Sequence, residues 1–220
     1  MLNFDASYVH CTYFLQGNKN VNHIKKVGDL LITSGKLCVC DPCYIDDKTR
    51  NQEMNLPVLT GIFPVLLDEK EHLINIIFNP RGDIFFWKDI DFKREKYPDS
   101  IEVDTGRYEF FDKDCLKAIE KNIKSGLYPN GYNDASPVGT HEFDSGYSGY
   151  EVEIAKSKNN IIGISTWYGD DEYTFQAGFN EEDRLQCITG FLLGKNFGPG
   201  FYVKEKNIPK KTINHFLKSK

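Results

Sequence analysis

The chain has 220 residues and a formal net charge of −5, with 40% apolar and 14% aromatic residues. Disordered chains combine few aromatic residues with a strong net charge, so this composition predicts a folded protein with a substantial core. The acidic balance makes nucleic acid an unexpected partner, because nucleic-acid binding needs a basic surface. No apolar run approaches the roughly 20 residues that cross a bilayer. The cysteine content and the lack of a secretory signal pattern predict a reduced, cytoplasmic protein with no membrane partner.

Taken in chain order, residues 1–24 are polar and predict a short strand or strap. Apolar segments then alternate with turns, and the richness in Tyr and Phe favours strands. Residues 46–57 predict a polar loop. Pro64 lacks a backbone N–H, which places its strand at a sheet edge or a bulge. The strands expected from this alternation lie at 30–32, 37–40, 61–67, 72–78, 84–87, 101–103, 108–111, 150–155, 161–167 and 173–177.

Helices are expected at three places. Asp112 is a suitable N-cap for a helix that ends at Gly126. A second helix is expected from Asn180, because the acidic residues that follow it complement the helix dipole. A third is expected after Pro209. Between the first helix and the next strand, residues 127–146 predict a polar loop of a length that is often functional.

These elements predict a β-rich α+β fold, because strand follows strand through short turns. We expect mostly antiparallel strands in two packed sheets or an open barrel, with two or three helices at one side. A single domain spans residues 1–220, with a β-rich core at 27–168 and a helical or loop extension at 169–220. The residues expected in the core are Leu37, Val39, Ile62, Val65, Leu73, Ile76, Phe78, Val103, Phe110, Val152, Ile154, Ile162 and Ile164.

Three cysteines, Cys38, Cys40 and Cys43, have a spacing that can hold zinc when a fourth ligand comes from elsewhere. A firm zinc signature has a second cysteine pair of this type, which the sequence lacks. Cys38 and Cys40 alternate in a strand, where free cysteines act as small buried hydrophobic residues. Either their face or the face of Leu37 and Val39 is expected to dominate the core. We therefore predict no metal site here and no cofactor.

The weak catalytic candidates are Asp41, Asp104, Asp144 and His141. An aspartate beside a turn usually accepts backbone N–H bonds, so the turn interpretation is favoured for all three acids. His141 could act as a general base, but no nucleophile motif accompanies it. An enzyme would need these residues and Asp112 to converge in one pocket. A small hydroxyl residue and a glycine precede several expected strands, at Ser34-Gly35, Thr60-Gly61, Thr105-Gly106 and Ser145-Gly146.

The candidate binding residues are aromatic or polar side chains near strand ends. Tyr132, His141 and Phe143 lie in the predicted loop, and Trp167 with Tyr168 lies at the end of the last strong hairpin. Such aromatic residues either pack onto a sheet or rim a recognition surface, where they serve as anchors. We favour the recognition surface.

The segment from Ser34 to Tyr44 ends in Asp-Pro-Cys-Tyr, and Val103 begins a Val-Asp-Thr-Gly turn with Asp112 downstream. Together with the hairpin from Tyr150, these motifs resemble a group of uncharacterised bacterial and phage proteins of the domain-of-unknown-function type. The resemblance covers roughly residues 27–168 and departs at Ser145, where the group has a Gly-Asp-Gly-Ser-Tyr start. It implies a phage or bacterial setting and brings no activity or catalytic residue with it.

The sequence therefore leaves two functions open. The first is a non-enzymatic binding protein for a partner protein or small ligand, in phage–host or toxin–immunity conflict. The second is a carboxylate- or metal-dependent hydrolase. The missing catalytic motifs and the acidic charge favour the first.

Overall fold

The computed structural model describes residues 23–45, 52–80, 84–93, 98–135, 137–167 and 169–194. Two six-stranded sheets pack against each other, and a two-stranded sheet lies beside them. The first sheet contains, in spatial order, β1 (Ile24–Ile32), β4 (Gly61–Asp68), β5 (Leu73–Ile77), β14 (Leu185–Phe191), β13 (Phe175–Phe179) and β6 (Phe86–Asp89). The second contains β3 (Glu53–Pro57), β2 (Lys36–Cys40), β8 (Arg107–Asp112), β11 (Asn160–Ser165), β10 (Ser148–Glu153) and β9 (Pro137–Glu142).

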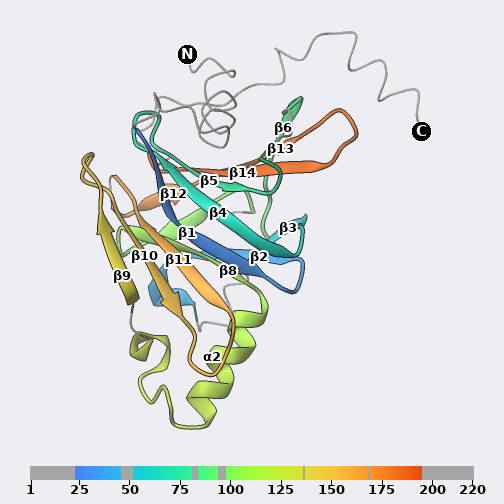
Figure 1. Cartoon of the computed structure of the whole chain (residues 1–220). Coiled ribbons are helices and arrows are strands. Elements are labelled where there is room, and N and C mark those ends of the chain that lie inside the picture. Colours follow the sequence, from blue (N-terminus) through green and yellow to red (C-terminus); the bar gives the residue numbers. More distant parts are fainter. Residues whose placement is uncertain are drawn as a thin grey trace.

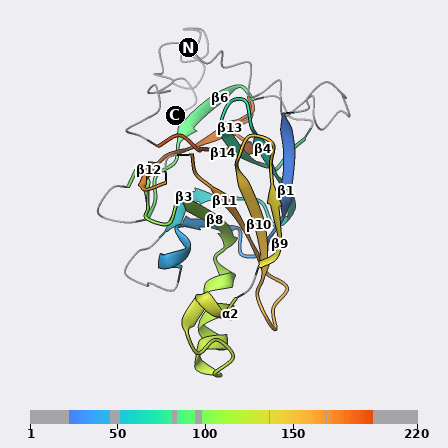
Figure 2. The same cartoon turned by 90° about the vertical axis from the view of Figure 1, so that its left-hand side faces the viewer.

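The remaining elements are short. The small sheet pairs β7 (Ile101–Val103) with β12 (Asp171–Tyr173), and the α-helix of the described part is α2 (Asp114–Lys124). Single 3-10 turns, η1 (Pro42–Tyr44) and η2 (Gly131–Asp134), follow β2 and α2. The first sheet lies above the second in Figure 1, and α2 projects below the second sheet in Figures 1 and 2. No helix in the described ranges is long and apolar enough to cross a membrane.

The predicted β-rich α+β class is confirmed. All strand pairings that the structure describes are antiparallel, as expected from the short turns between strands. Of the two architectures predicted, packed sheets describe the fold, because the twelve strands form two separate six-stranded sheets.

The main core lies between the inner faces of the two sheets, and a second apolar cluster lies between the outer face of the second sheet and α2. Strand β2 contributes side chains to both the main core and the second cluster. Leu37 and Val39 face the main core, whereas Cys38 and Cys40 face the cluster under α2. Neither face dominates, because both sides of the strand are covered. All the predicted core residues are buried except Ile62, which is 68% exposed on the outer side of β4.

The strand β1 joins the two sheets along one side. It pairs with β4 in the first sheet and also packs against β8, β10 and β11 of the second. Asn160 forms this link, since its side chain accepts a hydrogen bond from Leu31 N at 2.9 Å and donates to Asp29 O at 2.6 Å. A Cβ at Gly28 would lie 2.6 Å from Ile162 Cδ1, so the glycine permits the close approach.

The helix expected from Asn180 is wrong, because this segment forms a turn and then β14. Asn180 Oδ1 accepts hydrogen bonds from the backbone N–H of Glu182 (3.1 Å) and of Arg184 (2.9 Å), which closes the turn. Asp183 adopts a left-handed backbone, with φ of 58°. Residues 185–191 therefore form strand β14 in place of the expected helix. The helix expected after Pro209 lies outside the described residues.

The boundaries of the other elements differ less from those predicted. The expected loops at 46–57 and 127–146 contain β3, η2 and β9, and the aromatic strand begins at Phe86. The first helix is confirmed. Lys113, not Asp112, occupies the N-cap position, although Asp112 Oδ1 accepts a hydrogen bond from Asp114 N at 2.8 Å. Gly126 follows the helix with φ of 74°, a conformation that favours glycine. The strand or strap expected at 1–24 lies outside the described residues, except for its last two positions.

Candidate functional site

The first catalytic candidate, Asp41, is a turn-binding residue. Its side chain is fully buried, and Oδ2 accepts hydrogen bonds from Asp104 N (2.8 Å), Thr105 N (2.7 Å) and Thr105 Oγ1 (2.9 Å). The other oxygen accepts from Cys43 N at 2.7 Å and so caps η1. Burial alone would raise the pKa of Asp41, but these hydrogen bonds outweigh it and hold the pKa below its usual value. The geometry therefore supports the turn interpretation for Asp41.

Asp112 repeats this arrangement at the other end of the same pair of strands. It is fully buried and accepts hydrogen bonds from Thr33 N (2.9 Å), Ser34 N (2.8 Å) and Ser34 Oγ (2.8 Å). In both cases the aspartate follows the turn glycine of its own strand by 6 positions (35 to 41, and 106 to 112). Each strand therefore ends in a carboxylate that holds the turn preceding its neighbour.

The catalytic candidates do not all converge, since Asp41 and Asp104 are in contact and the others lie apart. Asp104 is exposed and accepts a hydrogen bond from Tyr44 Oη. Asp144 has a side chain that is 95% exposed and lies 3.7 Å from Lys25 Nζ. His141 is exposed on β9, which is three strands away from β8 in the second sheet.

Burial also determines whether the thiols of Cys38, Cys40 and Cys43 can ionise and bind a metal. Cys38 and Cys40 are buried, as predicted, and Cys43 is exposed. Burial raises the pKa of the Cys38 thiol to about 12, which disfavours the thiolate that a metal ligand needs. Within the described ranges, no group of three or more His, Cys, Asp or Glu side chains is arranged to hold a metal ion.

The predicted binding residues separate into buried and exposed ones. Tyr132 is buried on η2, where its hydroxyl donates to Glu109 Oε1 at 3.0 Å, so it does not rim a surface. Phe143 is half-buried against the main core, whereas Trp167 is 47% exposed. Tyr168 lies outside the described residues.

Trp167 belongs to an aromatic cluster that the sequence did not indicate. Its ring centroid lies 5.3 Å from that of His72 and 5.4 Å from that of Tyr147. His72 Nδ1 and Tyr147 Oη are 2.7 Å apart. His72 has a φ of 56°, which is uncommon for a residue other than glycine. Only Trp167 of the three is largely exposed, so the cluster gives one aromatic anchor and no enclosed site.

Glu109 is the second feature that sequence reasoning missed. It is buried on β8, and Oε1 accepts hydrogen bonds from Tyr132 and from Tyr150 (2.7 Å), while Oε2 has no partner. Burial raises the pKa of Glu109 to about 7, and the tyrosine hydroxyls and Arg107 only partly oppose this. With both oxygens enclosed, Glu109 has no path to a substrate, and its effect is on stability.

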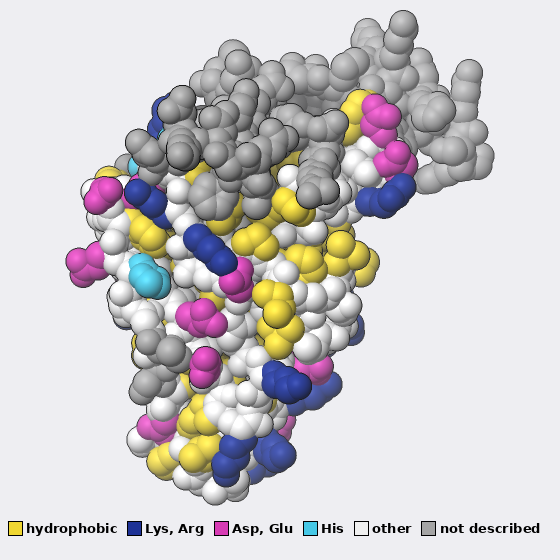
Figure 3. All heavy atoms as spheres, in the orientation of Figure 1, with side chains coloured by type: hydrophobic (Ala, Val, Ile, Leu, Met, Phe, Trp, Pro, Cys, Tyr) yellow, Lys and Arg dark blue, Asp and Glu magenta, His cyan; other side chains and the backbone are white. Residues whose placement is uncertain are grey.

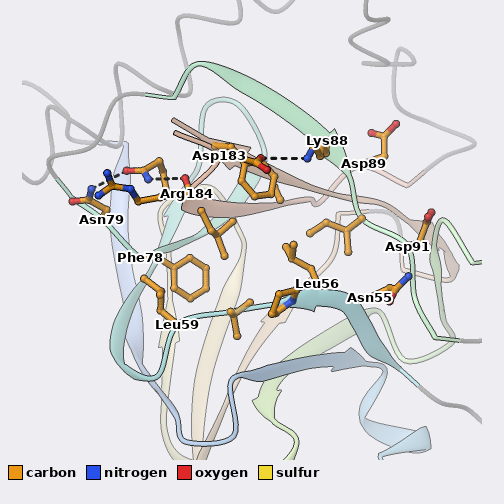
Figure 4. Close-up of a pocket in the computed structure, with 17 residues that line it drawn as sticks. Asn55, Leu56, Leu59, Phe78, Asn79, Lys88, Asp89, Asp91, Asp183 and Arg184 are labelled. Atoms are coloured by element: carbon orange, nitrogen blue, oxygen red, sulfur yellow. Dashed lines mark hydrogen bonds and ion pairs between the residues drawn. The ribbon is translucent and has the colours of Figure 1, made fainter. Parts of the chain in front are cut away.

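An open cleft among the described residues has a volume of about 820 Å³. It lies where the edge strands β3 and β6 diverge, next to the turn between β13 and β14 (Figure 4). Apolar side chains form its floor, and charged and amide side chains form its rim. The apolar lining is Leu56, Pro57, Val58, Leu59, Phe78, Ile90, Ala177, Phe179 and Leu185, and the polar lining is Asn55, Asn79, Lys88, Asp89, Asp91, Asp183, Arg184 and Gln186.

The β3 wall of this cleft is fixed by contacts beyond the second sheet. Met54 forms a bridge with Phe92, and Asn55 N donates to Asp91 O at 2.7 Å. Glu53 is buried and accepts hydrogen bonds from the ammonium groups of Lys93 and Lys113. These bonds outweigh burial and lower the pKa of Glu53 to about 2. The cleft therefore has a rigid wall, which favours a preformed site.

On the molecular face shown in Figure 3, acidic and basic side chains are interspersed, and the basic ones gather mainly toward α2. No protein-family model, curated protein or solved structure matches the chain. The resemblance based on Asp-Pro-Cys-Tyr stays a prediction. Two residues of that motif have structural roles, since Asp41 and Tyr44 both bind the turn at Asp104.

Proposed function

We propose that this protein is a non-enzymatic binding protein that holds the apolar part of a small ligand in the cleft between β3 and β6. The observation that carries the proposal is the cleft itself, whose volume of about 820 Å³ falls in the range of small-molecule sites. Such sites combine a mostly apolar lining with a few polar groups that orient the ligand. Buried Phe78 and Phe179 with the rim charges supply this combination.

The hydrolase alternative has weaker support. Hydrolysis by carboxylates needs two acidic groups, or an acid and a base, close to one reacting atom. Asp41 uses both of its oxygens on backbone and hydroxyl donors, and His141 lies on a distant strand. Asp104 contacts Asp41 through its backbone N–H, and its own carboxylate accepts a hydrogen bond from Tyr44 Oη, so both acids are engaged in turn contacts.

The proposal is tested with the neutral apolar fluorophore N-phenylnaphthylamine. Saturable binding of one fluorophore per chain is expected. Leu59→Gln should weaken binding about tenfold, because Leu59 is a 52% exposed wall of the cleft and loses apolar contact. Ile62→Gln is the matched control, since Ile62 is an exposed aliphatic residue outside the lining.

Comparison of Leu59→Gln with Ile62→Gln tests whether the fluorophore binds in the cleft. Both residues are exposed, so neither substitution should unfold the chain. Equal loss of binding in both variants, or no saturable binding by the parent protein, would refute the cleft as the site.

A further inference from the structure

The buried acid Glu109 lies in an arrangement that three strands of the second sheet build together. Tyr150 on β10 lies opposite Gly163 on β11, and Gly163 lies opposite Glu109 on β8. A Cβ at Gly163 would overlap the Tyr150 ring, so the glycine lets this ring cross β11 and reach the carboxyl group. Tyr132 reaches the same oxygen, Oε1, from η2, while Oε2 has no hydrogen-bond partner among the described residues.

The charged and titratable groups around Glu109 do not compensate its charge. Arg107 attracts the carboxylate from an exposed position on the same strand, whereas Asp41 at the end of β2 repels it. Cys40 lies opposite Glu109 on β2, and burial raises the pKa of its thiol well above the usual value, so it stays neutral. Burial outweighs Arg107 and the two tyrosine hydroxyls and raises the pKa of Glu109 to about 7.

The two tyrosines that bind Glu109 lie on elements of different strength. Tyr150 belongs to β10, which pairs with β9 and β11 on its two sides. Tyr132 belongs to η2, a turn whose own hydrogen bonds are local: Ala135 N donates to Tyr132 O at 2.8 Å, and Asn130 N donates to Asp134 Oδ2 at 2.6 Å. The turn can therefore leave the sheet as a unit without breaking a strand pairing.

We propose that Glu109 is a proton-dependent latch, which holds η2 on the second sheet when it is protonated and releases the turn when it is ionised. Release admits water to the carboxylate and supplies the solvation that Oε2 lacks in the closed form. It also exposes the ring of Tyr132, which is buried in the closed form. The inference is independent of the proposed function, because η2 lies outside the lining of the cleft.

The size of the effect follows from proton binding. The pKa of Glu109 is about 7 in the closed form, and in the open form water returns it toward 4.5. Between these two values the open form binds fewer protons, so a rise in pH favours opening. From pH 5.5 to pH 8.5 the ratio of open to closed chains should rise about thirtyfold, with little further change above pH 7.

Cys40 is a natural probe of this opening, because it lies opposite Glu109 and in the same apolar cluster as Tyr132. Cys38 is the matched control, since it lies on the same face of β2 but opposite Phe111. Both thiols of the full chain are labelled with iodoacetamide and quantified by peptide mass spectrometry. Dividing each rate by that of an unstructured peptide at the same pH gives the opening equilibrium at each site.

Cys40 should label about tenfold faster than Cys38, because only η2 has to move to expose it. Its normalised rate should rise about thirtyfold from pH 5.5 to pH 8.5. Glu109→Gln should remove this rise. Glu153→Gln, which replaces an exposed acid on β10, is the control variant and should keep it.

Three results would overturn the latch. Equal rates for Cys40 and Cys38 would show that Cys40 is reached only by wider unfolding. A normalised Cys40 rate that does not change with pH would show that ionisation of Glu109 does not release η2. A rise that persists in Glu109→Gln would assign the titration to another group. If Glu109→Gln does not fold, the first two comparisons in the parent protein still decide.

Discussion

Single carboxylates have specific structural roles in this protein. Asp41 and Asp112 each hold the turn before a neighbouring strand, and Glu69 does the same for a third turn by accepting from Ser145 N and Oγ. In these three turns the hydroxyl residue before the turn glycine, Ser34, Thr105 or Ser145, donates a further hydrogen bond to the carboxylate. This gives three of the four hydroxyl–glycine dipeptides a common structural role.

Replacing Asp41 should cost much stability. Asp41→Ala removes the buried carboxylate that accepts from the N–H groups of Asp104 and Thr105, so we expect a loss of about 3 kcal/mol in the free energy of unfolding. Asp144→Ala is the control, because its side chain is 95% exposed. Urea unfolding measures both variants. Similar stabilities for the two would contradict the role assigned to Asp41.

The lowered pKa of Asp41 predicts that the stability of the fold depends on pH. Because its pKa is lower in the folded chain than in the unfolded one, Asp41 stabilises the fold above the unfolded pKa. This contribution is lost as the pH falls through the folded value. The difference in stability between the parent protein and Asp41→Asn should therefore shrink in acid. A difference that stays constant with pH would argue against a charged Asp41.

The raised pKa of Glu109 predicts that stability falls as the pH rises. Its pKa rises from 4.5 in the unfolded chain to about 7 in the fold, so the unfolded chain loses the proton first. Stability should fall by up to about 3 kcal/mol between these two pH values and level off above them. In Glu109→Gln this fall should be absent. Parallel pH profiles for the two proteins would show that Glu109 is ionised at neutral pH.

At the scale of elements, the β13–β14 hairpin shows where sequence patterns fail. Acids at 181–183 followed by Leu185, Ile188 and Phe191 fit an amphipathic helix, but they also fit a turn and a strand that is covered on both faces. A Cβ at Gly190 would lie 2.7 Å from the Phe175 ring, so the glycine serves close packing. The segment is a strand because β14 pairs with β5, which is distant in sequence, and with β13, which lies across the turn.

The link between β1 and the second sheet gives a prediction at this scale. Asn160→Ala removes the hydrogen bonds to Leu31 N, Asp29 O and Glu151, so we expect a loss of about 2 kcal/mol. Amide exchange at Leu31 should also become faster. Asn130→Ala, which removes one exposed side-chain hydrogen bond to Asp134, is the control. Unchanged exchange at Leu31 would show that other contacts hold β1 in place.

At the scale of the whole molecule, the sequence predicts the fold class better than the site. Alternating strands such as 61–67 and 161–167, separated by turn residues, are visible locally, and nearly all predicted core residues are buried. The cleft is assembled from β3, β6 and the β13–β14 turn, which are far apart in the chain. Leu59 and Asp91 carry no local signal for this site, because only the order of strands within the sheets brings them together.

The central claim is that the cleft between β3 and β6 binds an apolar ligand group. A methyl NMR titration with N-phenylnaphthylamine tests it most directly, because it reports where the fluorophore binds. We expect the largest shifts at Leu56, Val58 and Leu185 of the cleft lining, with little change at Ile119 on α2 and Val152 beneath it. Largest shifts at the α2 cluster, with an unperturbed cleft, would contradict it.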